Sequence, residues 1–166
     1  MAEALPPAYF DTSALVKRYV VEEGSLHVRR LLRRYGVISS AVFHVEIGSA
    51  LRRRKTEGRL SAAALKRVLD RIRSDAASWS LVAVADEVLA LARDRVLQHP
   101  LRSLDAIHLA SAESIRREGV VLPFVTADAR QAAAARAVGL DVIDAVADRR
   151  RRAHRLRHRD ASPMRP

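Results

Sequence analysis

Short apolar segments alternate with helical segments along this chain, and this alternation restricts its fold more than any other feature. Segments with strand character lie at 8–10, from 37 onward, and at 79–84, 120–126 and 140–143. Apolar residues at helical spacing fill most of the sequence between them. Short apolar strands joined by helices are typical of a mostly parallel sheet covered on both faces. The sequence therefore predicts an α/β fold with about five short strands.

The helix boundaries follow from capping and breaking residues. Helices are expected over 12–20, 25–35, 41–57, 61–75, about 88–96, 103–118 and 129–138. Ser61 and Ser103 are predicted N-terminal caps, and Gly36 and Gly119 are predicted stops. Pro123 should restrict regular pairing to the second half of its strand.

The composition fits one soluble domain with a basic tail. The chain has 166 residues, 49% of them hydrophobic, and no apolar run approaches the ~18 residues of a membrane span. Its start lacks the features of a secretory signal, and the absence of cysteine excludes disulfides and thiolate zinc sites. We therefore expect a cytoplasmic protein with one domain over residues 1–146 and a tail over residues 147–166.

The net charge of +11 is unevenly distributed. Residues 149–166 hold eight Arg and one Asp, whereas residues 1–148 hold 22 Lys and Arg against 18 Asp and Glu. A basic chain favours polyanions, since each neutralised phosphate releases counterions, and this points to nucleic acid. The leading expectation for the tail is a solvated, disordered segment. Non-specific RNA binding is its alternative, and contact with a membrane would lack an apolar anchor.

Four acidic residues stand among apolar or small neighbours, unlike ordinary surface carboxylates: Asp11, Glu46, Asp105 and Asp128. Asp11 follows the first strand directly and Asp128 follows the fourth by two residues. Ligands of open parallel sheets bind at the carboxyl ends of the strands, so both acids can lie at that rim. Asp105 is expected there too, because the small, apolar residues 106–112 let its helix pack closely on the sheet.

Each acid also has a structural interpretation, which the residues alone leave open. Asp128 suits an N-cap equally well. Glu46 could lay its methylenes on the sheet and extend its carboxylate to water. Asp105 lies in a first helical turn, where the helix dipole stabilises an anion by about 0.3–1 kcal/mol.

Gathering such acids has a cost that a cation can offset. At about 5 Å and an effective dielectric near 20, each pair of carboxylates repels by about 3 kcal/mol. Oxygen-only ligands favour Mg²⁺ or Mn²⁺ over zinc or copper, and such sites commonly act on phosphate esters. The charge distribution fits an acidic metal pocket in a basic body that binds RNA or DNA.

Four motifs together resemble the PIN-domain ribonucleases, most closely the VapC-type toxins of toxin–antitoxin pairs. They are the segment 11–17 (DTSALVK), Glu46 on the helix after the second strand, the segment 104–110 (LDAIHLA) and the segment 125–128 (VTAD). The likeness spans about residues 8–145. Its motifs occur in order and at suitable separations.

The resemblance implies a three-layer α/β/α sandwich and Mg²⁺-dependent endonucleolytic cleavage of RNA by a metal-activated water. Asp11 and Asp105 would be the principal metal ligands, completed by Glu46 and Asp128. Thr12, Ser13 and Thr126 would supply nearby hydroxyls, of which the last two are better placed to hold the cluster. A homodimer and a small inhibitory antitoxin protein are the implied partners.

Other interpretations stay open. A non-catalytic RNA-binding module would use the acids as caps and dimer contacts. An aspartate-based phosphotransfer protein would use Asp11 as nucleophile, but the second Asp such proteins need two residues on is replaced by Ser13. His108 is interpreted as a packing or hydrogen-bonding residue outside the metal site. The run 52–55 is interpreted as a solvated helix end, with RNA contact as the alternative.

Overall fold

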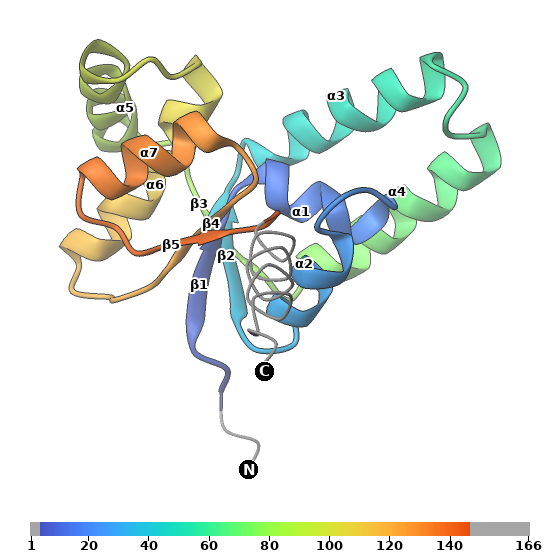
Figure 1. Ribbon diagram of the computed structural model, residues 1–166, viewed down its shortest axis with the longest axis horizontal. Coiled ribbons are helices and arrows are strands. Elements are labelled where there is room, and N and C mark those ends of the chain that lie inside the picture. The colour runs from blue at the N-terminus through green and yellow to red at the C-terminus, as the bar shows by residue number, and fades with distance from the viewer. Residues whose placement is uncertain (1–3, 147–166) are drawn as a thin grey trace, which may run out of the picture.

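The computed structural model describes residues 4–146, which form an all-parallel sheet between two layers of helices (Figure 1). The strands are β1 (Pro7–Phe10), β2 (Gly36–Ser40), β3 (Ser80–Val82), β4 (Phe124–Thr126) and β5 (Val142–Asp144). The helices are α1 (Thr12–Tyr19), α2 (Ser25–Leu31), α3 (Phe43–Thr56), α4 (Ala62–Ala76), α5 (Asp86–Gln98), α6 (Ser103–Arg117) and α7 (Ala129–Ala137). The predicted α/β/α sandwich with five strands is confirmed.

The strand order β3-β2-β1-β4-β5 puts β1 at the centre of the sheet. The chain first builds outward through β2 and β3 and then returns to the other side of β1 with β4 and β5. Tyr9 pairs with Ile38 of β2 and with Phe124 of β4. The order therefore reverses between β1 and β4, which is the position where open parallel sheets bind ligands.

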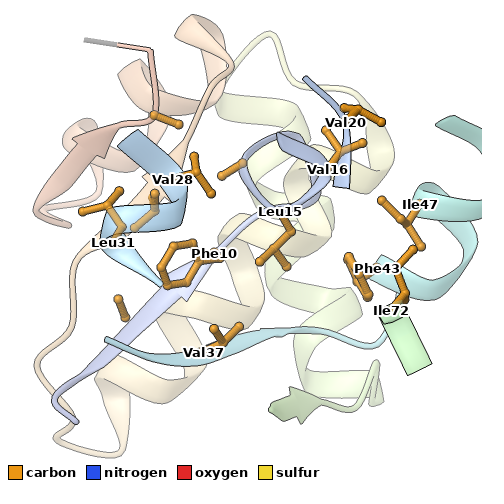
Figure 2. Close-up of a cluster of buried hydrophobic side chains, with 14 of the residues drawn as sticks. Phe10, Leu15, Val16, Val20, Val28, Leu31, Val37, Phe43, Ile47 and Ile72 are labelled. Atoms are coloured by element: carbon orange, nitrogen blue, oxygen red, sulfur yellow. The ribbon is translucent and has the colours of Figure 1, made fainter. Parts of the chain in front are cut away.

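Alternating side chains of β1 enter two separate cores. Phe10 is fully buried beneath α1, α2 and α3, in a cluster with Leu15, Val28 and Phe43 (Figure 2). Tyr9 points to the opposite face, where its ring stacks on Phe124 with centroids 5.3 Å apart. This two-residue period is what a strand buried on both faces requires.

Some predicted boundaries were wrong. The second helix ends at Leu31 rather than Tyr35. Beyond that residue the chain forms hydrogen bonds that span three residues instead of four, such as that from Arg34 N–H to the Leu31 carbonyl oxygen at 2.8 Å. Gly36 consequently opens β2. Ser103 is not the cap of α6, since Arg102 occupies that position without a side-chain cap. The cap predicted at Ser61 is confirmed by its hydrogen bond from Ala64 N–H, at 3.2 Å.

The predicted tail, residues 147–166, lies outside the described residues. Between residues 4 and 146, none of the helices combines the length and apolar character needed to cross a membrane.

Candidate active site

Asp11 leads directly from β1 into α1 and is almost completely buried, with 2% of its surface exposed. Its extended backbone (φ −77°, ψ 168°) makes it the N-cap of α1, and its Oδ1 accepts the Ala14 N–H at 2.9 Å. The Ser13 hydroxyl donates to both carboxylate oxygens at 2.8 and 2.9 Å, and Thr126 of β4 donates to Oδ2 at 2.9 Å. The carboxylate is thus fixed at the topological switch.

Burial raises the pKa of the Asp11 carboxyl to about 6. The interaction with His108 and the hydrogen bonds from Ala14, Ser13 and Thr126 lower it, but they do not compensate for lost solvation. An acid in this position gains from a neighbouring cation, because the charged form lacks sufficient stabilisation from the protein.

Glu46 reaches the same region from the first turn of α3. Its Oε2 accepts the Thr12 hydroxyl at 2.5 Å and lies 2.7 Å from His108 Nε2. Burial acts to raise the pKa of Glu46, but the interactions with His108 and Thr12 outweigh it and hold the pKa below its ordinary value. Glu46 is therefore a carboxylate held in place by α1 and α6, rather than one extended freely into water.

Asp105 lies in the first turn of α6 and is partly buried. Burial is the main cause that raises the pKa of Asp105. The negative charge of Asp128 raises it further, and that of Glu46 does so more weakly. Repulsion between these acids, which come from different parts of the chain, therefore adds to the larger effect of burial. Asp105 and Asp128 are therefore electrostatic neighbours, although 22 intervening residues separate them in the sequence.

Asp128 has both of the placements that the sequence left open. Its Oδ1 accepts the N–H groups of Arg130 and Gln131 at 2.8 and 3.1 Å, which makes it the N-cap of α7. It also lines the cavity that contains the other three acids. Capping and a position at the rim are thus compatible.

One cavity of about 440 Å³ at the carboxyl end of the sheet is lined by all four predicted acids. Its wall also includes the hydroxyl residues Thr12 and Ser13, and His108. The basic part of the lining comes from Lys17 and from four arginines: Arg53, Arg54, Arg59 and Arg102. The cavity therefore joins an anionic floor to a cationic rim, and the run 52–55 is not wholly a solvated helix end.

The donor set fits a hard divalent cation, because it consists of carboxylate and hydroxyl oxygens in which Asp11 and Asp105 have raised pKa values. Within residues 4–146, no three acidic or histidine side chains stand close enough to form a ready-made metal-binding group. Asp11, Glu46 and Asp128 are each held by separate hydrogen bonds. A shared cation would need to draw these carboxylates inward.

The three predicted hydroxyls all donate to acids of this cavity: Ser13 and Thr126 to Asp11, and Thr12 to Glu46. The sequence analysis interpreted His108 as a packing or hydrogen-bonding residue but did not identify Glu46 as its partner. One feature of the sequence could have indicated such a partner. His108 is a polar ring within the small, apolar stretch 106–112, and a histidine buried there needs hydrogen-bond partners.

Comparisons with known proteins agree with this arrangement. The PIN domain family model matches residues 8–137. "Ribonuclease VapC46" of Mycobacterium tuberculosis (strain ATCC 25618 / H37Rv) is 39% identical over 137 residues, which cover 81% of this chain and 95% of that protein. "Ribonuclease VapC35" of the same species is 35% identical over 141 residues, 81% of this chain and 94% of the relative.

Two solved structures share the fold. A chain of "Crystal Structure of FitAcB from Neisseria gonorrhoeae" superposes with a TM-score of 0.60 at 13% identity, covering 83% of this chain and 97% of that one. A chain of "Toxin-antitoxin complex from Klebsiella pneumoniae" gives 0.55 at 16% identity with the same coverage. The family match and the curated relatives cover most of the sequence, and the chain therefore belongs to the PIN domain family as a relative of the VapC ribonucleases.

Proposed function

We propose that this protein is a Mg²⁺-dependent endoribonuclease, with Mn²⁺ as a possible substitute, and the toxin component of a type II toxin–antitoxin pair. The observation that carries the proposal is the one cavity that Asp11, Glu46, Asp105 and Asp128 line together, with arginines at its rim. The names of the curated relatives support ribonuclease activity. A cytoplasmic location would give such an enzyme access to RNA.

Asp11 and Asp105 would be the principal metal ligands, with Glu46 and Asp128 as auxiliary ones. When bound, the divalent ion supplies positive charge against the phosphate and acidifies a coordinated water. Ser13 and Thr126 keep the Asp11 carboxylate oriented toward the site through their O–H groups. Thr12 performs the same task for Glu46. These hydroxyls limit the reorganisation needed when ligand binds.

The arginine rim would hold the substrate backbone. Arg53 and Arg102 line the cavity beside the acids, so phosphates flanking the scissile bond can contact guanidinium groups. Arg54 is less available, because it forms an ion pair with Glu22. Cationic side chains on the rim and carboxylates on the floor divide the tasks of binding the backbone and supporting cleavage.

The proposed partners are an inhibitory antitoxin protein and a second copy of this chain. The antitoxin is supported by the Klebsiella pneumoniae structure, whose name identifies a toxin–antitoxin complex. The homodimer comes from the family resemblance alone. Size-exclusion chromatography with light scattering tests it directly, and a monomer at micromolar concentration would contradict it.

The test of catalysis uses purified protein and an end-labelled single-stranded RNA with Mg²⁺. Wild-type protein should cut the RNA, and excess EDTA should stop cleavage until Mg²⁺ or Mn²⁺ is restored. Asp11→Asn and Asp105→Asn should each abolish cleavage while leaving RNA binding largely intact. Asp94→Asn, at an exposed position of α5, controls for the loss of one negative charge.

Full activity in both Asn variants, or cleavage that is indifferent to EDTA, would overturn the mechanism. RNA binding by the wild-type protein without any cleavage would favour the non-catalytic RNA-binding module instead. Growth arrest on expression, relieved by Asp11→Asn, tests the toxin role separately from the chemistry.

A further inference from the structure

A line of polar side chains crosses the buried layer between the sheet and α6. It begins at Tyr9 on β1, which is fully buried, passes through His108 on α6, which is 1% exposed, and ends at Glu46 in the cavity. The Tyr9 hydroxyl lies 2.9 Å from His108 Nδ1, and His108 Nε2 lies 2.7 Å from Glu46 Oε2. Burying such groups is costly unless each is paired, and here both ring nitrogens have partners.

The partners determine how the hydrogens are arranged. Carboxylate oxygens only accept, so the hydrogen of a neutral imidazole must lie on Nε2, facing Glu46. Nδ1 is then the acceptor for the Tyr9 O–H. Burial raises the pKa of Tyr9 well above its ordinary value, so the phenol keeps the proton that it donates. Tyr9 thereby selects the tautomer that is useful at the cavity.

Both donors to Glu46 converge on one oxygen. Thr12 Oγ1 donates to Oε2 at 2.5 Å, and His108 Nε2 contacts the same Oε2 while lying 2.9 Å from Thr12 Oγ1. Among residues 4–146, no protein group forms a hydrogen bond with the other oxygen, Oε1. The carboxylate is therefore held by one oxygen, with the second available for a ligand in the cavity.

We propose that His108 is a positioning residue, which Tyr9 holds from behind so that Glu46 presents one oxygen to the cavity. The imidazole would not touch the substrate or the cation, and would act only through the carboxylate. This role rests on the proposed function, in which Glu46 is an auxiliary metal ligand. A packing role alone would explain the burial of His108, but it would not require the alignment of Tyr9, His108 and Glu46.

The test compares variants that differ in the Nε2 donor. His108→Leu fills much of the space without a donor, whereas His108→Gln keeps an amide N–H directed at Glu46. Tyr9→Phe removes only the hydroxyl and preserves the ring that stacks on Phe124. Glu113→Gln is the matched control, because Glu113 is equally buried on α6 but pairs with Arg95 on α5, away from the cavity.

Two measurements distinguish positioning from packing. The first is Mn²⁺ binding by calorimetry, which does not depend on turnover, and the second is the division of any loss between kcat and KM for RNA. His108→Leu should weaken Mn²⁺ binding and lower kcat, each by about 10- to 100-fold, with KM nearly unchanged. Tyr9→Phe should show a smaller loss of the same kind, and His108→Gln should recover most of it. Glu113→Gln should lose stability alone.

A double-mutant cycle gives the sharpest outcome. If His108 acts through Glu46, adding His108→Leu to Glu46→Gln should reduce kcat much less than it does in the wild-type background. Equal reductions in both backgrounds, or normal Mn²⁺ affinity and kcat in folded His108→Leu, would overturn the positioning role while leaving the nuclease intact. A wild-type protein that neither binds Mn²⁺ nor cuts RNA would overturn the proposed function and this inference with it.

Discussion

Replacing Asp11 by Asn should make the cation-free protein more stable at neutral pH, although the same change should remove its activity. The Asp11 carboxyl has a pKa of about 6 in the fold, because burial outweighs its hydrogen bonds, against an ordinary value of 3.8. When the carboxyl is ionised in both states, this difference costs the native state about 3 kcal/mol. An Asn side chain can still accept the Ala14 N–H that caps α1, without the charge.

The sign of the pH dependence follows from the raised pKa. Between pH 3.8 and about 6 the folded state binds more protons than the unfolded state, so stability falls as pH rises through this interval. At pH 7.5 the ionised carboxyl costs about 3 kcal/mol, and at pH 4.5 about 1 kcal/mol. The stability advantage of Asp11→Asn should therefore shrink by about 2 kcal/mol on acidification.

Urea unfolding in EDTA at the two pH values measures this change, with Asp94→Asn as the control for net charge. Saturating Mg²⁺ should then stabilise the wild-type protein by more than the Asn variant, because only the native wild-type site retains the full ligand set. An advantage of Asp11→Asn that is equal at both pH values, or an Asn variant less stable than wild type at pH 7.5, would refute this account of the buried charge.

Three further predictions concern the scaffold and the rim. Gly24→Ala should destabilise the protein by more than Gly58→Ala in thermal unfolding. Both glycines have positive φ, which costs alanine about 1–2 kcal/mol, but of the two only Gly24 would place a Cβ 2.3 Å from a backbone oxygen. The Arg18 hydrogen bond lowers the pKa of Asp75, so the difference in unfolding free energy between wild type and Asp75→Asn should shrink as pH falls below about 4. A constant difference in urea unfolding from pH 7 to 3 would contradict this. Arg53→Gln should reduce the salt dependence of binding to single-stranded RNA. For one phosphate contact, the magnitude of the slope of log binding constant against log salt concentration should fall by about 0.7, and an unchanged slope would show that Arg53 does not contact the RNA.

Much of the fold could be predicted because its determinants are local. Alternating strand and helix patterns identified all five strands, and Pro123 correctly confined β4 to its second half, Phe124–Thr126. The predicted helix boundaries were wrong where the hydrogen bonds of the fold outweighed the capping and breaking preferences of single residues. Arg102 precedes α6 as an uncapped N-terminus, although Ser103 next to it is the better capping residue. A capping preference is an average over many helices, whereas in one protein the path of the loop before the helix determines which residue takes the N-cap position.

The partners of the site residues could not be predicted, because they are contacts across long sequence separations. Nothing local shows that Tyr9 meets His108, 99 residues away, or that His108 meets Glu46 across 62. Those pairs depend on the topology, which packs α6 against the sheet. The apolar setting identified the acids, and the topology determined what surrounds them.

The four acids share a placement that explains how one fold tolerates them together. Asp11 and Asp128 are the N-caps of α1 and α7, and Glu46 and Asp105 lie in the first turns of α3 and α6. Four helices therefore begin around one cavity, each directing the positive end of its dipole toward a carboxylate. Such an interaction contributes about 0.3–1 kcal/mol, whereas two carboxylates at about 5 Å repel by about 3 kcal/mol. The dipoles reduce the repulsion without cancelling it, and repulsion from Asp128 adds to burial, the larger cause, in raising the pKa of Asp105. A divalent cation bound in this cavity would offset the negative charge that the dipoles leave uncompensated.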